Sequence, residues 1–202
     1  MRPIAFILPV KALDRAKSRL AGAVGDDERR RLVMTMYHHV LSCALGSGAT
    51  RVVVMTRDER VGKAGSEAGA DWVVDSGSSL NASLQALFDA CWNENQTPCY
   101  LPADLPFLQP EDLTDLLERA SEPERVVASP SLDGLGTNAL LVPPAGRLTL
   151  SLGPGSFARH LARASEHGLR TAIVRRPGLG FDLDTVADLR RYRASAVLPE
   201  VS

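Results

Sequence analysis

Short apolar runs alternate with segments of helical periodicity along the chain, and this alternation restricts the fold more than any other feature. The runs are apolar at successive positions, as in strands buried on both faces. The segments between them repeat apolar side chains every three or four residues, as one face of a helix does. This alternation predicts a mostly parallel, mixed sheet with helices on both faces. We therefore expect one Rossmann-like, three-layer α/β domain over residues 1–202.

The pattern also places the elements along the chain. The expected strands cover residues 4–8, 51–56, 72–75, 99–103, 126–129, 139–142 and 171–174. The expected helices cover residues 26–45, 59–68, 81–91, 110–119, 156–167 and 186–193. Asp26 suits a helix N-cap and Pro110 a first turn, because Asp accepts from free helical N–H groups and Pro has none to lose. No repeat, low-complexity tract or linker divides the chain in two.

Charge and cysteine content exclude several classes of function. The net charge of −1 gives no basic field for nucleic acid or an anionic membrane. The first apolar run is too short for a signal peptide or a spanning helix. Cys43, Cys91 and Cys99 are odd in number and widely spaced, unlike a disulfide framework or a metal site. We therefore expect free thiols and a cytoplasmic location, with neither nucleic acid nor membrane as a partner.

The stretch from Tyr100 to Leu108 points to a site. Its apolar run ends in one carboxylate, Asp104, between Pro102 and Pro106. Each proline fixes φ and removes a backbone donor, so the strand cannot simply continue. Ligands of open α/β sheets bind at the carboxyl ends of the strands. Asp104 is therefore a candidate functional residue on stiff backbone.

A cationic loop follows the first strand. Lys11, Arg15, Lys17 and Arg19 fall within nine residues, where Rossmann-like folds place nucleotide phosphates. Lysine offers a compact charge to phosphate and arginine a bidentate one. A solvated basic loop is the alternative. The loop carries neither GxxxxGK[ST] nor GxGxxG, so it is neither a P-loop nor a dinucleotide fingerprint.

Two further acids lie near the end of the chain, in Gly180-Phe-Asp182-Leu-Asp184-Thr185. Alternate residues of an extended segment point to the same side, so Asp182 and Asp184 present their carboxylates together while Leu183 turns inward. Hard oxygen ligands of this kind suit Mg²⁺ with substrate phosphates. The alternative is a plain N-cap for the last helix. With Asp104 and the cationic loop, the pair predicts a divalent-metal nucleotide site.

Two loops supply neutral donors. In the first, Thr137 and Asn138 follow a glycine-containing turn and suit a carboxylate or phosphate, although a tight connection explains the same residues. In the second, Gly153-Pro-Gly-Ser156 opens a helix, where free N–H groups and a capping Ser make an anion pocket. Simple capping is the alternative there. His160 in the first turns of this helix is more typical of a structural histidine than of a catalyst.

Five motifs in register resemble a known family: Pro9–Lys11 with Ala16–Leu20, Leu101–Pro106, Asp133–Asn138, Gly153–His160 and Gly180–Thr185. Together they are similar to the phosphoenolpyruvate or 2-phospho-L-lactate guanylyltransferases of deazaflavin-coenzyme biosynthesis. The resemblance implies a glycosyltransferase-A-like fold, as in nucleotide-diphospho-sugar transferases. Relatives that make the molybdopterin cofactor carry a glycine-rich first loop, whereas this chain has Pro-Val-Lys.

The resemblance also implies a reaction and its residues. GMP would pass from GTP to a small phosphorylated three-carbon acid, expected to be phosphoenolpyruvate, with 2-phospho-L-lactate and 3-phosphoglycerate left open. Asp104, Lys17 and Lys11 would be catalytic, and the nucleotide would be bound by Lys11, Lys17, Asn81 and Asp104. The metal, Mg²⁺, would be held by Asp104, Asp182 and Asp184, and the acid by Thr137, Gly153 and Ser156. The oligomeric state stays open, including a homodimer.

This chemistry is physically coherent. A phosphate monoester has a second pKa of about 6, so the acceptor needs no general base. The obstacle is repulsion between two anions, which cations relieve. A metal-dependent glycosyltransferase would share the paired acids but release a nucleoside diphosphate. A non-catalytic nucleotide-binding module would have no need of three converging acids.

Overall fold

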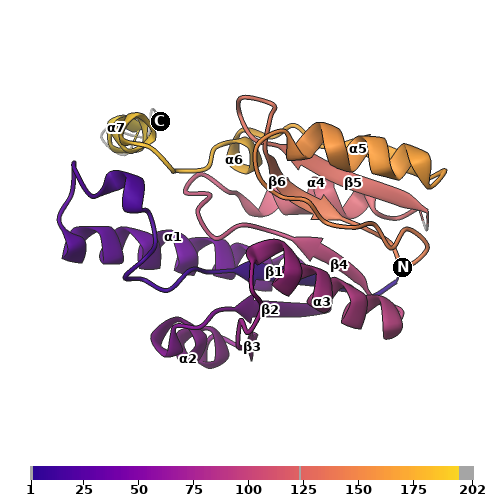
Figure 1. Cartoon of the computed structure of the whole chain (residues 1–202), viewed down its shortest axis with the longest axis horizontal. Helices are drawn as coiled ribbons and strands as arrows, with labels where there is room; N and C mark the ends of the chain where they lie inside the picture. The colour runs from indigo at the N-terminus through magenta and orange to yellow at the C-terminus, as the bar shows by residue number, and fades with distance from the viewer. Residues whose placement is uncertain (1, 123, 196–202) are drawn as a thin grey trace.

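A seven-stranded sheet forms the centre of the computed structural model, which describes residues 2–122 and 124–195 (Figure 1). Its strand order is β3-β2-β1-β4-β6-β5-β7. The strands are β1 (Ile4–Pro9), β2 (Arg51–Met55), β3 (Asp71–Val73), β4 (Thr97–Tyr100), β5 (Arg125–Pro130), β6 (Thr137–Leu141) and β7 (Arg170–Ile173). Each strand overlaps the apolar run that predicts it, with ends shifted by up to three residues.

The helices follow the predicted pattern with small shifts at their ends. They are α1 (Asp26–Gly46), α2 (Glu59–Glu67), α3 (Leu80–Asn93), α4 (Pro110–Arg119), α5 (Ser156–Glu166) and α7 (Val186–Ser195). Two short elements were not expected, the 3₁₀ turn η1 (Ser18–Leu20) and the single turn α6 (Pro177–Gly180). None of the described helices has the length and apolar character needed to cross a membrane.

The sheet is mixed because one strand is reversed. β1 pairs in parallel with β2 and β4, and β2 pairs in parallel with β3. β6 runs antiparallel to both β4 and β5, and β7 is again parallel to β5. The predicted mostly parallel, mixed sheet is therefore confirmed. The carboxyl ends of β1 to β4 consequently open toward the same edge.

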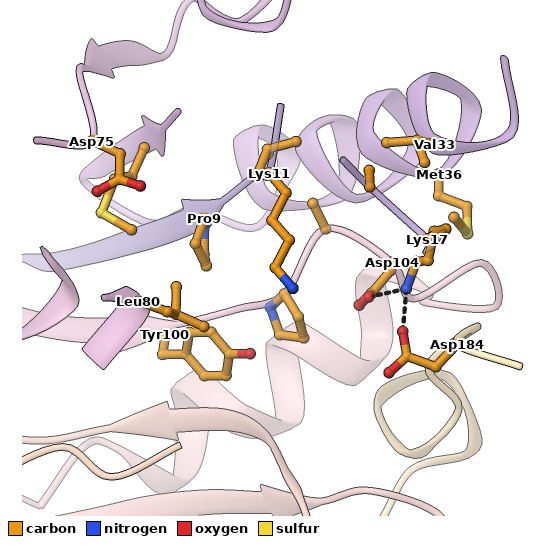
Figure 2. A pocket seen from close by; sticks show the side chains of 15 residues that line it. Pro9, Lys11, Lys17, Val33, Met36, Asp75, Leu80, Tyr100, Asp104 and Asp184 are labelled. Atoms are coloured by element: carbon orange, nitrogen blue, oxygen red, sulfur yellow. Dashed lines mark hydrogen bonds and ion pairs between the residues drawn. The ribbon is translucent and has the colours of Figure 1, made fainter. Parts of the chain in front are cut away.

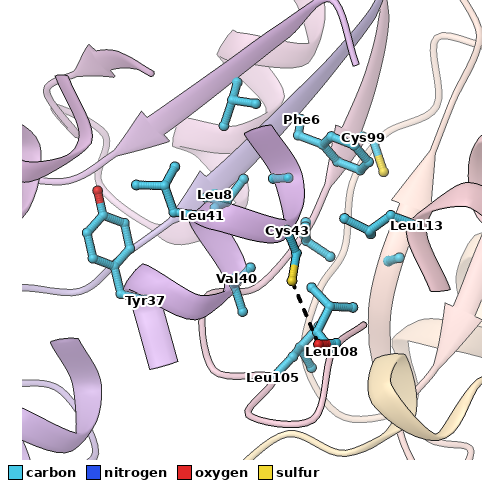
Figure 3. Packing of buried hydrophobic residues seen from close by; sticks show 14 of the residues in the cluster. Phe6, Leu8, Tyr37, Val40, Leu41, Cys43, Cys99, Leu105, Leu108 and Leu113 are labelled. Carbon is cyan, nitrogen blue, oxygen red and sulfur yellow. Dashed lines mark hydrogen bonds between the residues drawn. The ribbon is translucent and has the colours of Figure 1, made fainter. Parts of the chain in front are cut away.

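Helices cover both faces, which gives the expected three layers. On one face, α1, α2 and α4 cover the sheet, and Phe6 and Leu8 of β1 are fully buried in one cluster with Val40, Leu41 and the leucines of α4 (Figure 3). On the other face, α3 packs against Ala5 and Ile7 of β1, and α5 packs against β5 and β7. Burying both faces of the central strands explains why these strands are apolar throughout.

Three local expectations are wrong, each for a backbone reason. β4 ends at Tyr100 instead of Ala103, because Pro102 has no N–H with which to continue the ladder. Asp26 is the first residue of α1 and Gly25 is its N-cap. Likewise Gly155, at φ 71°, precedes α5, so Ser156 does not cap this helix with its side chain. The glycine takes the left-handed conformation that a side chain disfavours.

A small apolar cluster beside the sheet brings together an early and a late segment of the sequence. Leu20, Met36 and Leu183 are almost fully buried in it, so the loop after β1, helix α1 and the segment 181–184 pack together. The backbone N–H of Leu183 also donates to the carbonyl of Asp104 at 3.1 Å. Leu183 turns inward as predicted, and its burial fixes where the acids on either side of it lie.

Candidate active site

A cleft of about 320 Å³ opens at the carboxyl ends of β1 and β4. Its lining comes from segments that are distant in sequence, mainly the loop after β1, helix α1, the segment after β4 and Asp184 (Figure 2). Lys11, Lys17, Asp104 and Asp184 all line it. The sequence predicted each of these four as a site residue, and the fold brings them together.

Lys17 lies between the two carboxylates. Its ammonium donates to Asp104 Oδ2 and, at 2.6 Å, to Asp184 Oδ1 (Figure 2). The lysine side chain is only 8% exposed, against 28% for Asp104 and 45% for Asp184. Its backbone is left-handed, at φ 52° and ψ 40°, which is uncommon for a residue with a side chain. Such a conformation at a site costs free energy that the surrounding structure must offset.

The charges of this group depend on one another. Burial alone would lower the pKa of Lys17, but the negative charges of Asp104 and Asp184 outweigh it and raise that pKa. Burial likewise works against the charge of Asp184, yet Lys17, Arg19 and Lys11 hold the pKa of its carboxyl below the usual value. Lys17 is therefore charged and Asp184 ionised at neutral pH.

Asp182 sits beside this group and is held differently. Its Oδ1 accepts from Asn138 Nδ2 at 3.1 Å, and the same amide donates to the carbonyls of Leu179 and Gly180. Burial, together with the charges of Asp104 and Asp184, raises the pKa of Asp182. Asn138, predicted as a donor to ligand, here fixes an acid instead.

The acids fit a cation, although they do not stand ready as a cluster of three. No group of three or more metal-ligating side chains occurs among residues 2–122 and 124–195. Asp104 Oδ1, however, is buried without a hydrogen-bond partner. A buried carboxylate oxygen left without a donor is an acceptor that a hard divalent cation suits. This oxygen of Asp104 therefore suits a divalent cation.

Lys11 differs from Lys17 in having no ion pair or hydrogen bond among the described residues. Its side chain is exposed and extends into the cleft (Figure 2). An unpaired ammonium beside Asp104 and Asp184 can receive the phosphate of a ligand without first losing a protein partner. The geometry thus agrees with the predicted contact to phosphate.

A second group of predicted residues lies apart from the cleft lining, beside the start of α5. Thr137 Oγ1 and Ser156 Oγ are 3.0 Å apart, and both residues are buried. The carbonyl of Gly153 accepts from the Ser156 N–H. The Phe157 N–H donates to Leu135, so this helix end has fewer free N–H groups than the sequence implied.

Asn81, expected near the nucleotide, uses its amide on the backbone of Leu152. Its Oδ1 accepts from the Leu152 N–H at 2.7 Å and its Nδ2 donates to the Leu152 carbonyl at 3.2 Å. These two bonds fasten the loop before α5 to the start of α3. The structure therefore places Asn81 outside the cleft lining and in contact with the loop that carries Gly153.

Two cleft residues were missed by the sequence interpretation. Asp75 follows β3 and lines the far end of the cleft, and Tyr100 ends β4 with its hydroxyl toward the acids (Figure 2). Burial and the charges of Asp104, Asp182 and Asp184 raise the pKa of Tyr100, which keeps it protonated. Asp75 could have been predicted from the sequence, because it follows a strand whose carboxyl end lies at the same edge of the sheet as Asp104.

With this geometry in place, comparison with known proteins decides the family. The family model described as guanylyl transferase CofC like matches residues 4–192. The chain belongs to this family. A phosphoenolpyruvate guanylyltransferase from Rubrobacter xylanophilus is 40% identical over 190 residues, covering 94% of this chain and 93% of its own. The chain is accordingly a nucleotidyltransferase, as the resemblance of its five motifs implied.

Two solved structures of low sequence identity share the fold of this chain. A putative nucleotide-diphospho-sugar transferase from Desulfovibrio desulfuricans superposes with a TM-score of 0.78 at 16% identity, covering 99% of this chain and 90% of that one. Rv0371c from Mycobacterium tuberculosis, solved in complex with manganese, gives 0.56 at 19% identity, covering 96% and 100%. The predicted nucleotide-diphospho-sugar transferase-like fold is confirmed.

Proposed function

We propose that this guanylyl transferase moves GMP from GTP to phosphoenolpyruvate and releases pyrophosphate, as a step of deazaflavin-coenzyme biosynthesis. The observation that carries the reaction type is the cleft in which Lys17 joins Asp104 to Asp184 while Lys11 stays unpaired. The acceptor is supported by the relative from Rubrobacter xylanophilus, which is named for it.

The chain's own cations address the main obstacle of this reaction. An ionised phosphate oxygen of the acceptor must approach the α-phosphate of a highly charged nucleotide. Lys11 is free to bind phosphate, and Lys17 supplies a buried positive charge at the floor of the cleft. Fixed charges of this kind stabilise the transition state without having to reorganise. No side chain is needed as a general base, because the acceptor phosphate is mostly ionised at neutral pH.

Asp104, Asp182 and Asp184 would hold a divalent cation, which we expect to be Mg²⁺. The buried Asp104 Oδ1 without a hydrogen-bond partner supports this role. When bound, such a cation supplies positive charge to the phosphate oxygens and orients them. Asn138 holds the Asp182 carboxylate in position, and Lys17 keeps Asp104 and Asp184 side by side.

The acceptor would be bound by the second group, Thr137, Gly153 and Ser156. Two hydroxyls 3.0 Å apart next to a helix N-terminus suit an anion. This assignment puts nucleotide and acceptor on different elements of the fold. A cytoplasmic location agrees with three free, buried thiols. A homodimer remains a prediction that the geometry neither requires nor supports.

The experiment is a pyrophosphate-release assay with GTP or ATP and each of three acids: phosphoenolpyruvate, 2-phospho-L-lactate and 3-phosphoglycerate. We expect turnover with GTP and phosphoenolpyruvate, and loss of turnover when the divalent cation is chelated. Pyrophosphate release with another acid only would refute the acceptor. Release of a nucleoside diphosphate from a nucleotide sugar, with no pyrophosphate, would refute guanylyl transfer and favour a glycosyltransferase.

A further inference from the structure

His160 forms two hydrogen bonds that together fix where its ring proton lies. The histidine is fully buried on α5. Its Nε2 is 3.1 Å from the backbone nitrogen of Ser151, and its Nδ1 is 3.0 Å from Thr137 Oγ1. A backbone N–H can only donate, so Nε2 must accept and cannot carry a proton. The neutral ring therefore carries its proton on Nδ1, which donates to Thr137.

The loop that sets this tautomer is itself held firmly. Arg159 donates to Ser151 Oγ at 2.8 Å, to the Ser151 carbonyl at 3.0 Å and to the Pro154 carbonyl at 2.7 Å. Asn81 bonds both backbone groups of Leu152, the next residue. Burial, with smaller contributions from the charges of Arg163 and Arg159, lowers the pKa of His160 to about 4, so the ring is neutral at neutral pH.

The direction of the His160 bond determines what the neighbouring hydroxyls can offer. Thr137 Oγ1 accepts from His160 and lies 3.0 Å from Ser156 Oγ. One hydrogen bond joins the two hydroxyls and uses one of their two protons. The other proton stays free to donate. With the opposite tautomer, Thr137 would donate to Nδ1 and Ser156 to Thr137, and no hydroxyl proton would remain.

We propose that His160 is a positioning residue that, by donating to Thr137, leaves the Thr137–Ser156 pair one free hydroxyl proton for the anionic group of the acceptor. The inference rests on the proposed function only in assigning this pair to the acceptor. It gives the histidine a role beyond packing, since an apolar side chain of similar volume would fill the space but leave Thr137 free to reorient. It also gives a reason for the bonds by which Arg159 and Asn81 hold the loop whose Ser151 N–H meets the ring.

The first test reads the tautomer directly in the unmodified protein. A long-range proton–nitrogen NMR spectrum of the ¹⁵N-labelled chain at neutral pH distinguishes a protonated ring nitrogen from an unprotonated one. We expect the His160 signals to show a proton on Nδ1 and none on Nε2. A proton on Nε2, or a charged ring, would overturn the proposal. This measurement needs no turnover, so it stands even if the proposed acceptor is wrong.

The second test separates positioning from packing. In His160→Asn the side-chain amide lies near the position of Nδ1 and still donates, whereas His160→Leu cannot. We expect His160→Leu to raise the KM for the acceptor about tenfold, because Thr137 loses the donor that fixes its orientation and the free hydroxyl proton of the pair is no longer held toward the acceptor. The KM for GTP should stay unchanged, and His160→Asn should recover most of the loss. His38→Leu, at an exposed histidine of α1, is the control.

Three results would contradict the positioning role: an unchanged acceptor KM in His160→Leu, an equal rise in the KM for GTP, or a folded His160→Asn no better than His160→Leu. If His160→Leu does not fold, the NMR measurement and the acceptor KM of His160→Asn decide. If no acid supports pyrophosphate release from GTP in the wild-type chain, the proposed function fails, while the tautomer is still decided by NMR.

Discussion

The cleft and the Thr137–Ser156–His160 cluster differ in whether their polar groups have partners within the protein. In the cleft, Lys11 has no partner among the described residues and Asp104 Oδ1 is buried without a donor. In the cluster, both ring nitrogens of His160 and both hydroxyls are hydrogen-bonded. Charged groups without a protein partner suit a ligand of opposite charge, whereas a network that fixes the direction of two hydroxyls and leaves one proton free suits a directed hydrogen bond. We infer that the cleft acts through charge and the cluster through geometry.

The largest effect should come from removing the charge at the floor of the cleft. We choose Lys17→Asn because Asn tolerates the left-handed backbone at this position. The expected loss in kcat is about 10²–10³-fold, as for other fixed transition-state charges. Pyrophosphate release measures it, with Lys63→Asn on the exposed side of α2 as the control. A normal kcat in Lys17→Asn would show that the Lys17 charge does not contribute to catalysis.

A substitution in the cluster should change the KM for the acceptor and leave the KM for GTP unchanged. Ser156→Ala removes one hydroxyl of the pair, and the KM for the acceptor should rise about tenfold or more, since a hydrogen bond to a charged group is worth about 1.5–3 kcal/mol. The KM for GTP should not change. Steady-state kinetics with each substrate varied in turn checks this, with Ser165→Ala on the same helix as the control. A rise in the KM for GTP alone would reverse the two assignments.

A smaller effect is expected at Lys11. Lys11→Gln should raise the KM for GTP about three- to tenfold and leave that of the acceptor unchanged, because one exposed charge–phosphate contact is lost. Added salt should shrink the difference between variant and wild type, since exposed charges are screened. The free energy of unfolding should change by less than about 0.5 kcal/mol. Insensitivity to salt would argue that Lys11 does not meet a phosphate.

How far could these two regions be predicted from sequence? The acids and lysines of the cleft could be predicted. Asp104 follows a strand at the carboxyl edge of the sheet, and Lys11 and Lys17 lie in the loop after the first strand. Asp184 was indicated by its alternation with Asp182 along an extended segment. The prolines around Asp104 predicted that a strand ends near it, and the glycines before Ser156 predicted the start of α5. What the sequence did not reveal is that Lys17 joins Asp104 to Asp184, since that contact spans 167 residues.

The cluster could be predicted only as separate residues. The loops indicate Thr137 and Ser156 as candidates, but a lone histidine such as His160 is more typical of a structural residue than of a functional one. No sequence pattern states which backbone N–H a buried ring will meet. The prediction that the Ser156 side chain caps α5 is wrong for a related reason. Gly155 takes a left-handed conformation before α5, and this moves the Ser156 hydroxyl from the helix end onto Thr137.

The smallest expected effect lies outside both regions, at Asp58. Its carboxylate accepts from the Leu13 N–H at 3.0 Å and from the Arg60 N–H at 3.1 Å, so it ties the cationic loop to the start of α2. Asp58→Asn should lower the free energy of unfolding at pH 7 by about 1 kcal/mol, because Asn still caps α2 but loses the charge that pairs with the Arg60 side chain. The KM for GTP should rise less than in Lys11→Gln.

The sign of the pH dependence follows from the same contacts. Arg60 and the two N–H donors lower the pKa of Asp58 to about 2 against the cost of its burial. The stabilisation is therefore complete above the unfolded-state value of about 4 and is lost as the pH falls toward 2. Urea unfolding across this range should show wild type and Asp58→Asn converging at low pH. A constant difference would mean that the carboxylate charge is not involved.

The central claim is that the chemistry depends on the negative charge of Asp104. The most direct measurement compares pyrophosphate release from GTP and phosphoenolpyruvate in Asp104→Asn and in Asp89→Asn, which changes an exposed carboxylate of α3. We predict that Asp104→Asn loses at least about 10²-fold in kcat while unfolding cooperatively, and that Asp89→Asn matches wild type. Near-normal pyrophosphate release by Asp104→Asn would contradict the account.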